Sequence, residues 1–336
     1  NASGSGTASV GANVIANVVS TAVNAYVNNS TVSTTGGLNV SANSAMNTYD
    51  AIISTTFATA AGVGVTGINN IYSGETKAVV QNSTVKNGNV EISADDTFNL
   101  NSVVFSIAAA IGSGAAVSAI ENANVIENSV IANLINSKIL NEENVNAVNV
   151  NLNAQNSVYI NNILAALSVV NTGAGVNVIP NVNQFTGKTE AKIEDSSINN
   201  AATSLLAKTK ANVNAGIVGA SAAAAGASVG GYTITNIFDN DIDAIIDDTT
   251  LTSAKSTTLT AESDIDILNG LASGGLAGIG ANILANVLVN TINNNVGANI
   301  LNSTIDGGSI STSAKQDSNI NNNAYAVAGT VKGETT

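Results

Sequence analysis

The residues best placed to bind a metal ion form a short acidic run. Asp239, Asp241 and Asp243 occupy alternate positions, and Asp247 and Asp248 follow them. Carboxylate oxygens with this spacing could hold calcium, although an EF-hand loop would need Gly and Glu where Ala244 and Thr250 stand. On a β-strand the three aspartates would simply form one solvated row. The run is therefore a weak calcium candidate, with a solvent-facing row of charge as the simpler interpretation.

A second motif has the letters of a dinucleotide fingerprint. Gly62, Gly64 and Gly67 follow the G-x-G-x-x-G spacing. That fingerprint requires a following helix, and no helical pattern follows here. Paired glycines also recur elsewhere in the chain without a third one. We expect a turn of a repeat and no cofactor.

The residue types limit the catalytic chemistry. The chain has no His, no Cys and no Arg, since all ten positive charges are lysines. Activation of a nucleophile by His is impossible, and a glycan-degrading enzyme would depend on Lys or on paired carboxylates. The carboxylates are scattered along the chain. We predict that the protein is not an enzyme and has no catalytic residues, and keep a glycan-degrading enzyme using Asp241 or Asp243 as an alternative.

Composition predicts an ordered β-protein. Of 336 residues, 44% are hydrophobic and only 10% are charged, the reverse of a disordered chain. Val, Ile and Thr favour strands, whereas Asn and Gly favour turns. The net charge of -13 argues against binding nucleic acid or anionic membranes. The uncharged stretch 211–237 is rich in Ala, Gly and Ser, so we expect it to form buried coil faces and not a membrane span.

A short motif recurs along the whole chain. It consists of a turn former, two polar residues that usually carry hydroxyls, and an apolar residue, as in Asn29-Ser30-Thr31-Val32. Its second residues are Ser30, Ser83, Ser137, Ser196, Thr249 and Ser303, at intervals of 53, 54, 59, 53 and 54 residues. Such regular spacing is typical of repeat architectures. We interpret each copy, including the three that match glycosylation sequons, as a corner of a stacked coil.

An apolar triplet at alternate positions follows each corner, and a glycine-rich stretch lies inside the longer remaining block. The triplets begin at Leu38, Val90, Val150, Leu205, Thr257 and Ile310. Period-two alternation predicts strands with one buried face. The sequence therefore predicts a parallel β-helix of about six ~54-residue repeats, each most simply two coils of about 27 residues or alternatively three of about 18. Polar residues inserted around 140–144 predict a corner loop. We expect one solenoid segment spanning 1–336, a fragment without caps of its own.

The repeats resemble those of known secreted proteins. Units such as Ala78-Val79-Val80-Gln81-Asn82-Ser83-Thr84-Val85, followed by Val90-Glu91-Ile92-Ser93-Ala94, are similar to passengers of bacterial type V secretion. The likeness is to leukotoxin-type filamentous adhesins and filamentous-haemagglutinin-like exoproteins of Gram-negative bacteria. It implies a β-solenoid exported to the cell surface or medium. It implies an adhesin, a toxin body or a stalk, and assigns no site residues.

These observations together predict a structural, adhesive repeat segment of a large bacterial surface or secreted protein. Sheet faces and corner loops would make repeated weak contacts with host-cell or bacterial surface molecules, whether protein or glycan. The body of a secreted cytotoxin is the alternative from another functional class.

Overall fold

The computed structural model describes residues 2–141 and 148–330, and this part of the chain contains strands and no helix. The strands are β1 (Ala2–Asn28), β2 (Thr31–Ser33), β3 (Leu38–Gln81), β4 (Thr84–Lys86), β5 (Val90–Ile135), β6 (Lys138–Leu140), β7 (Val148–Glu194), β8 (Ser197–Asn199), β9 (Ala201–Asp247), β10 (Thr250–Thr252), β11 (Ser256–Ala277), β12 (Asn282–Ile292), β13 (Asn295–Leu301), β14 (Thr304–Ile305) and β15 (Ser309–Thr330). All pairs are parallel and in chain order, which confirms the predicted parallel β-helix.

Each repeat forms one coil. Val40 pairs with Ile92, Ile92 with Leu152, and Leu152 with Leu205, so equivalent residues are 52, 60 and 53 positions apart. The prediction of two coils per repeat is therefore wrong, as is the alternative of three. Asn and Gly inside the long block suggested extra corners, but most of them continue a strand. The fourth triplet was also misplaced by two residues, because Thr203 and not Leu205 pairs with Val150.

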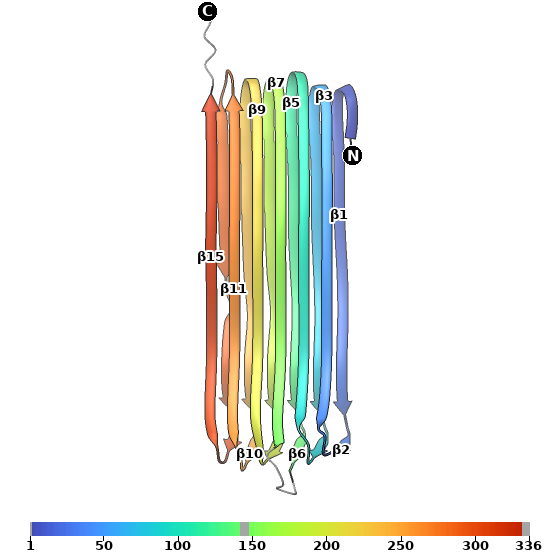
Figure 1. Ribbon diagram of the computed structural model, residues 1–336, viewed down its shortest axis with the longest axis vertical. Coiled ribbons are helices and arrows are strands. Elements are labelled where there is room, and N and C mark those ends of the chain that lie inside the picture. The colour runs from blue at the N-terminus through green and yellow to red at the C-terminus, as the bar shows by residue number, and fades with distance from the viewer. Residues whose placement is uncertain (1, 142–147, 331–336) are drawn as a thin grey trace, which may run out of the picture.

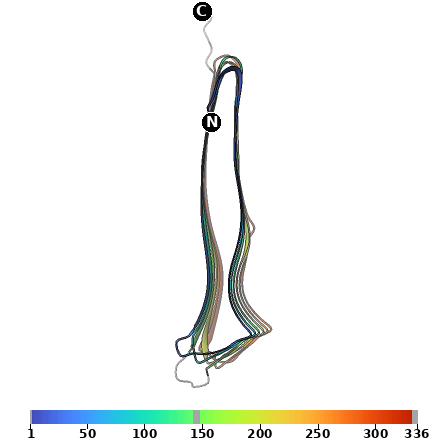
Figure 2. The ribbon, with the colours of Figure 1, turned by 90° about the vertical axis from the view of Figure 1, so that its right-hand side faces the viewer.

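A coil is a long, flat loop. Figure 1 shows the long strands side by side, and Figure 2 shows each coil as two extended limbs joined by an arch at one end. In β5 the first limb covers 90–110 and the second covers 115–135, whereas short strands such as β4 and β6 close the coil at the other end. We call the arched end the tip and the end with the short strands the base.

Glycine makes the arch possible. Gly114, Gly173, Gly226 and Gly280 have φ between 124° and 158°, a region that other residues rarely adopt. A Cβ on Gly173 would collide with the carbonyl oxygen of Gly114 in the preceding coil. The predicted glycine turn is confirmed, and Gly62, Gly64 and Gly67 lie in β3 just after the arch, with no helix behind them.

The predicted corners are confirmed at the base. The first residue of every motif copy has a left-handed backbone, with φ of 44° to 52°, namely Asn29, Asn82, Asn136, Asp195, Asp248 and Asn302. Asn and Asp tolerate this conformation better than other residues with side chains. The predicted insertion at 140–144 falls mainly within 142–147, outside the described residues.

The apolar core is thickest at the base. The largest cluster there includes Val80, Val85, Ile92, Leu134 and Ile139, each no more than 1% exposed. A second cluster with Phe98, Phe185 and Phe238 fills the middle, whereas the cluster at the tip contains only four alanines and Val170. Small side chains therefore separate the two limbs at the tip.

Polar side chains fill much of the remaining interior. An amide ladder runs through six coils, with each Nδ2 donating to the next Oδ1 at 2.8 or 2.9 Å, through Asn17, Asn70, Asn124, Asn183, Asn236 and Asn290. Asp50, Asn162 and Asn269 on the opposite limb also bond to it. Because every coil supplies an amide at the same depth, each ladder amide finds a partner in a neighbouring coil.

In the described part of the chain, no helix is long and apolar enough to cross a membrane. The uncharged stretch 211–237 lies in β9 and only alternate residues are buried there, while Val218 is 57% exposed. The expected buried coil faces are therefore found on one side of this stretch only.

Candidate binding surfaces

The outer side of the first limbs carries two adjacent rows of amides and tyrosines, which we call the amide–tyrosine face. Since period-two alternation points every second side chain outward, one residue from each coil enters each row. Register places Asn47, Asn99, Tyr159, Asn212, Asp266 and Asn319 in one row, and Tyr49, Asn101, Asn161, Asn214, Leu268 and Asn321 in the other.

This face is hollowed. Two adjoining hollows of about 280 and 410 Å³ share Tyr159, Asn212 and Asn214, and a third of about 300 Å³ continues from Asn214 towards the tip. Tyr49 is 77% exposed and Tyr159 37% exposed, so both rings are accessible. Together the hollows form a shallow groove that runs across neighbouring coils.

Several of these amides are free to bind a ligand. Asn99 donates to Asn47 at 2.8 Å and Asn161 donates to Asn101 at 3.4 Å. Among the described residues, the side-chain amides of Asn212 and Asn214 have no hydrogen-bond partner, while their backbones pair in the sheet. A carboxamide offers both a donor and an acceptor, and an exposed tyrosine offers an apolar ring with a polar tip. This combination suits ligands with many hydroxyl groups attached to flat, C–H-rich faces.

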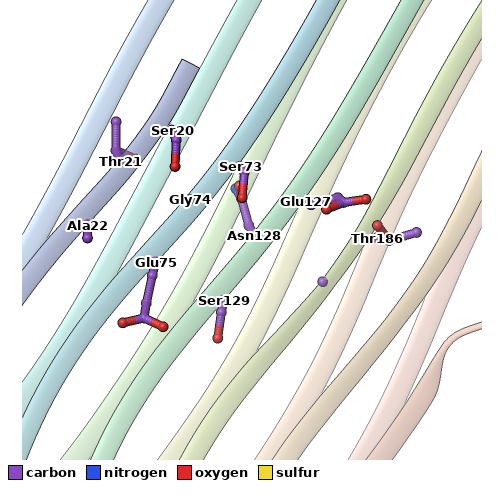
Figure 3. A pocket seen from close by; sticks show the side chains of 11 residues that line it. Ser20, Thr21, Ala22, Ser73, Gly74, Glu75, Glu127, Asn128, Ser129 and Thr186 are labelled. Carbon is purple, nitrogen blue, oxygen red and sulfur yellow. The ribbon is translucent and has the colours of Figure 1, made fainter. Parts of the chain in front are cut away.

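A second groove, of about 530 Å³, lies on the outer side of the second limbs (Figure 3). Ser20, Ser73, Glu75, Glu127 and Ser129 project from neighbouring strands into this region. The Glu75 carboxylate accepts a 2.6 Å hydrogen bond from Lys77. The groove is acidic and open, with few apolar walls to enclose a small molecule.

The predicted calcium residues lie in line with this groove. Asp239 and Asp241 continue its two rows of side chains in β9, and Asp243 follows in the next row towards the base. They point to one side of the strand, as period-two alternation predicts. Within residues 2–141 and 148–330, no three His, Cys, Asp or Glu side chains group closely enough to hold a metal ion. The calcium site stays a prediction without added support.

The pKa of the Asp243 carboxyl is raised, so its ionised form is disfavoured. Partial burial raises the pKa of this carboxyl, the charges of Asp241 and Glu190 raise the pKa further, and Lys188 lowers it. Lys188 lies beside Asp241 in the register and forms a 2.6 Å ion pair with Glu190. Basic residues therefore already neutralise part of this acidic row without a metal ion.

The sequence interpretation did not identify the amide–tyrosine face. Its signal is a pair of Asn or Tyr residues two positions apart, as in Asn47/Tyr49, Asn99/Asn101, Tyr159/Asn161 and Asn212/Asn214. Recognising these pairs as one surface requires the repeat length to equal one coil. With two or three coils per repeat, the pairs would have been separated by intervening strands.

Comparisons with known proteins found no counterpart. No family model matches the chain. No curated protein and no solved structure is similar to it.

Proposed function

We propose that this chain is a non-enzymatic adhesive segment of a large bacterial surface or secreted protein, and that it binds glycans through the amide–tyrosine face. The confirmed β-helix is compatible with the passengers of type V secretion that the repeats resemble. The proposed location is the outer surface of the bacterium or the surrounding medium.

One observation carries the proposal. Exposed amides recur in register in five of the six coils, the exception being the coil with Asp266 and Leu268, and they flank Tyr159, which lies between Asn99 and Asn212. Hydroxyl groups of a sugar pair with carboxamides, and its C–H faces pack on an aromatic ring. Because successive coils are about 4.8 Å apart, one extended glycan would meet several equivalent groups. Weak contacts would then add up through multivalency.

Binding of the purified chain to an array of immobilised host and bacterial glycans tests this function. We expect a restricted set of glycans to bind, and Tyr159→Ala to weaken binding to them about tenfold, the equivalent of one lost stacking contact. Tyr26→Ala is the matched control, since Tyr26 is 53% exposed but lies near the base on the second limb of β1. Both variants should retain the circular dichroism spectrum of a β-protein.

Two results would contradict the proposal. The chain would be a spacer if it bound no glycan on the array, even when presented multivalently. Equal loss of binding in the Tyr159 and Tyr26 variants would place the glycan site outside the amide–tyrosine face.

A further inference from the structure

The tip half of the molecule has an inverted polarity. Inside it lie buried polar residues such as Ser54, Ser106, Ser168 and Ser221. Outside it lie exposed apolar residues, and the segments 8–18, 51–71, 103–125, 163–184, 216–237 and 270–291 contain one charged residue, Glu121. An outer surface with exposed apolar side chains and a single charged residue over this extent marks an interaction site.

The outer side of the second limbs carries the more regular of the two apolar surfaces, which we call the valine face. Its row nearest the tip is β-branched in all six coils, and consists of Val10, Val63, Val117, Val176, Val229 and Ile283. Four further rows follow towards the base. The last of them consists of Val18, Ile71, Val125, Gln184, Ile237 and Thr291. Below them, the row with Ser73 and Glu127 begins the polar groove of Figure 3.

The corresponding side of the first limbs is apolar but uneven. One of its rows contains Ile53, Phe105, Ala165, Val218, Ala272 and Tyr325 in succession. Large and small side chains alternate there, so the relief changes from coil to coil. On the valine face the row nearest the tip is uniform, whereas an inner row contains Gly67, Glu121 and Thr233.

We propose that the valine face is a self-association surface on which a second copy of this chain packs. This interaction is independent of glycan binding, and it goes beyond the adhesive function because it joins two solenoids to each other. The expected arrangement is a face-to-face dimer with two-fold symmetry, in which the same residues of both copies meet.

The dimensions of the face support a dimer. Measured between outermost residues, five rows span roughly 26 Å along the strands, and six coils at about 4.8 Å span roughly 24 Å across them. The area is therefore on the order of 600 Å² from each copy, which is at the lower end of the contribution of one partner to a stable protein interface. The polar row containing Ser73 and Glu127 would form its rim.

The row spacing favours a copy of the chain over other partners. Ridges of β-branched side chains about 4.8 Å apart mesh best with another sheet of the same spacing, at the sheet-to-sheet distance of about 10 Å. A lipid phase fits less well, because it offers no ridges at that spacing.

Glu121 lies near the centre of the valine face, between Gly67 of one neighbouring coil and Pro180 of the other. In a two-fold dimer the Glu121 side chains of both copies would come close together in an apolar interface. Their charges would weaken the dimer without preventing it. Replacing Glu121 by Gln should therefore strengthen association.

Sedimentation velocity of the purified chain over a range of concentrations tests the proposal. We expect a reversible dimer, a dimer dissociation constant at least tenfold higher in Val178→Lys, and a several-fold lower one in Glu121→Gln. Val169→Lys is the matched control and should leave the dimer unchanged. Val178 is 44% exposed on the valine face and Val169 is 41% exposed on the first limb of the same coil.

A cysteine cross-link checks the geometry, because the chain has no cysteine of its own. A short bismaleimide should join Val178→Cys into a covalent dimer and should not join Val169→Cys, because sheets about 10 Å apart are too distant for a direct disulfide. A chain that stays monomeric, or a dimer that survives Val178→Lys, would overturn the proposal, the latter pointing to pairing through strand edges. Flotation with phosphatidylcholine vesicles that is lost in Val178→Lys would overturn it in favour of a lipid-binding surface.

Discussion

The backbone N–H of Ser83 donates to Oγ of Ser137, one coil further along the chain, at 3.1 Å. The same Oγ donates to the carbonyl oxygen of Ile135 at 2.8 Å and so closes its own corner. One hydroxyl thus shapes a turn and joins two coils. The other corners repeat this arrangement, which explains why Ser or Thr recurs at this position although the neighbouring residues vary.

Ser137→Ala should lower the free energy of unfolding by about 1–3 kcal/mol, since the buried N–H of Ser83 would lose its acceptor. Urea denaturation followed by circular dichroism measures this change. Ser129→Ala, a substitution on the outer surface, should change the free energy by less than about 0.5 kcal/mol. Equal effects of the two substitutions would show that the hydroxyl row contributes nothing.

The backbone at Asn136 has a φ of 44°, which leads to a different prediction for the same corner. Asn136→Gly should be nearly neutral, because glycine adopts this conformation readily, although the hydrogen bond from the Asn136 side chain to Asn82 is lost. Asn136→Val should destabilise the fold by about 1–2 kcal/mol or more. A valine variant as stable as the glycine variant in thermal unfolding would contradict the corner geometry.

The interior amide ladder predicts a loss of stability on changing Asn124. This side chain accepts from Asn70 at 2.9 Å and donates to Asn183 at 2.8 Å. Asn124→Ala would remove two buried hydrogen bonds, at a cost of roughly 1–3 kcal/mol, while Asn70 still donates to Asp50 and Asn183 still accepts from Asn162. Asn99→Ala removes an exposed amide pair and should cost much less. Comparable urea midpoints for the two variants would mean that the interior ladder is not formed.

Asp96 predicts a dependence of stability on pH. Its side chain is buried beside Tyr72, and burial raises the pKa of the carboxyl, while hydrogen bonds from Ser44 and Tyr72 oppose the rise. An acid whose pKa is higher in the folded than in the unfolded state contributes full stability below its unfolded pKa, and that contribution is lost as pH rises.

Asp96→Asn should therefore raise the free energy of unfolding at neutral pH, and the gain should disappear below about pH 4. Asparagine already occupies the equivalent position in the next coil, at Asn156, so the substitution fits the row. Asp317→Asn, at an exposed site, should show no comparable gain. Chemical denaturation at pH 3, 5 and 7 distinguishes the two patterns.

Local patterns in the sequence predicted the corners, the glycine arch and the strands correctly. Asn29 and its counterparts mark a backbone conformation, and Val40 and Ala42 alternate with polar residues, so both signals lie within a few residues. The length of the coil was not predictable in the same way. Asn70 looks like a turn former in the sequence, but in the fold it points inward and bonds to Asn124.

The two candidate surfaces could not be predicted without the length of the coil. Tyr159 and Asn212 are 53 residues apart, and nothing in the local sequence places them side by side. The same is true of Val117 and Val176 on the valine face, which are 59 residues apart. Only the acidic run was visible directly, because its residues are neighbours along one strand.

The register of one coil per repeat underlies every surface described above, and paired cysteines in this cysteine-free chain test it most directly. Ser41 and Ser93 are in-register neighbours on the outer side of adjacent first limbs, whereas Asn69 lies on the second limb. A Ser41→Cys/Ser93→Cys variant should form an intramolecular disulfide under mild oxidation, because neighbouring strands place their Cα atoms within bridging distance. Ser41→Cys/Asn69→Cys should stay reduced. The opposite outcome, a cross-link between 41 and 69 and none between 41 and 93, would mean two coils per repeat and would contradict the account.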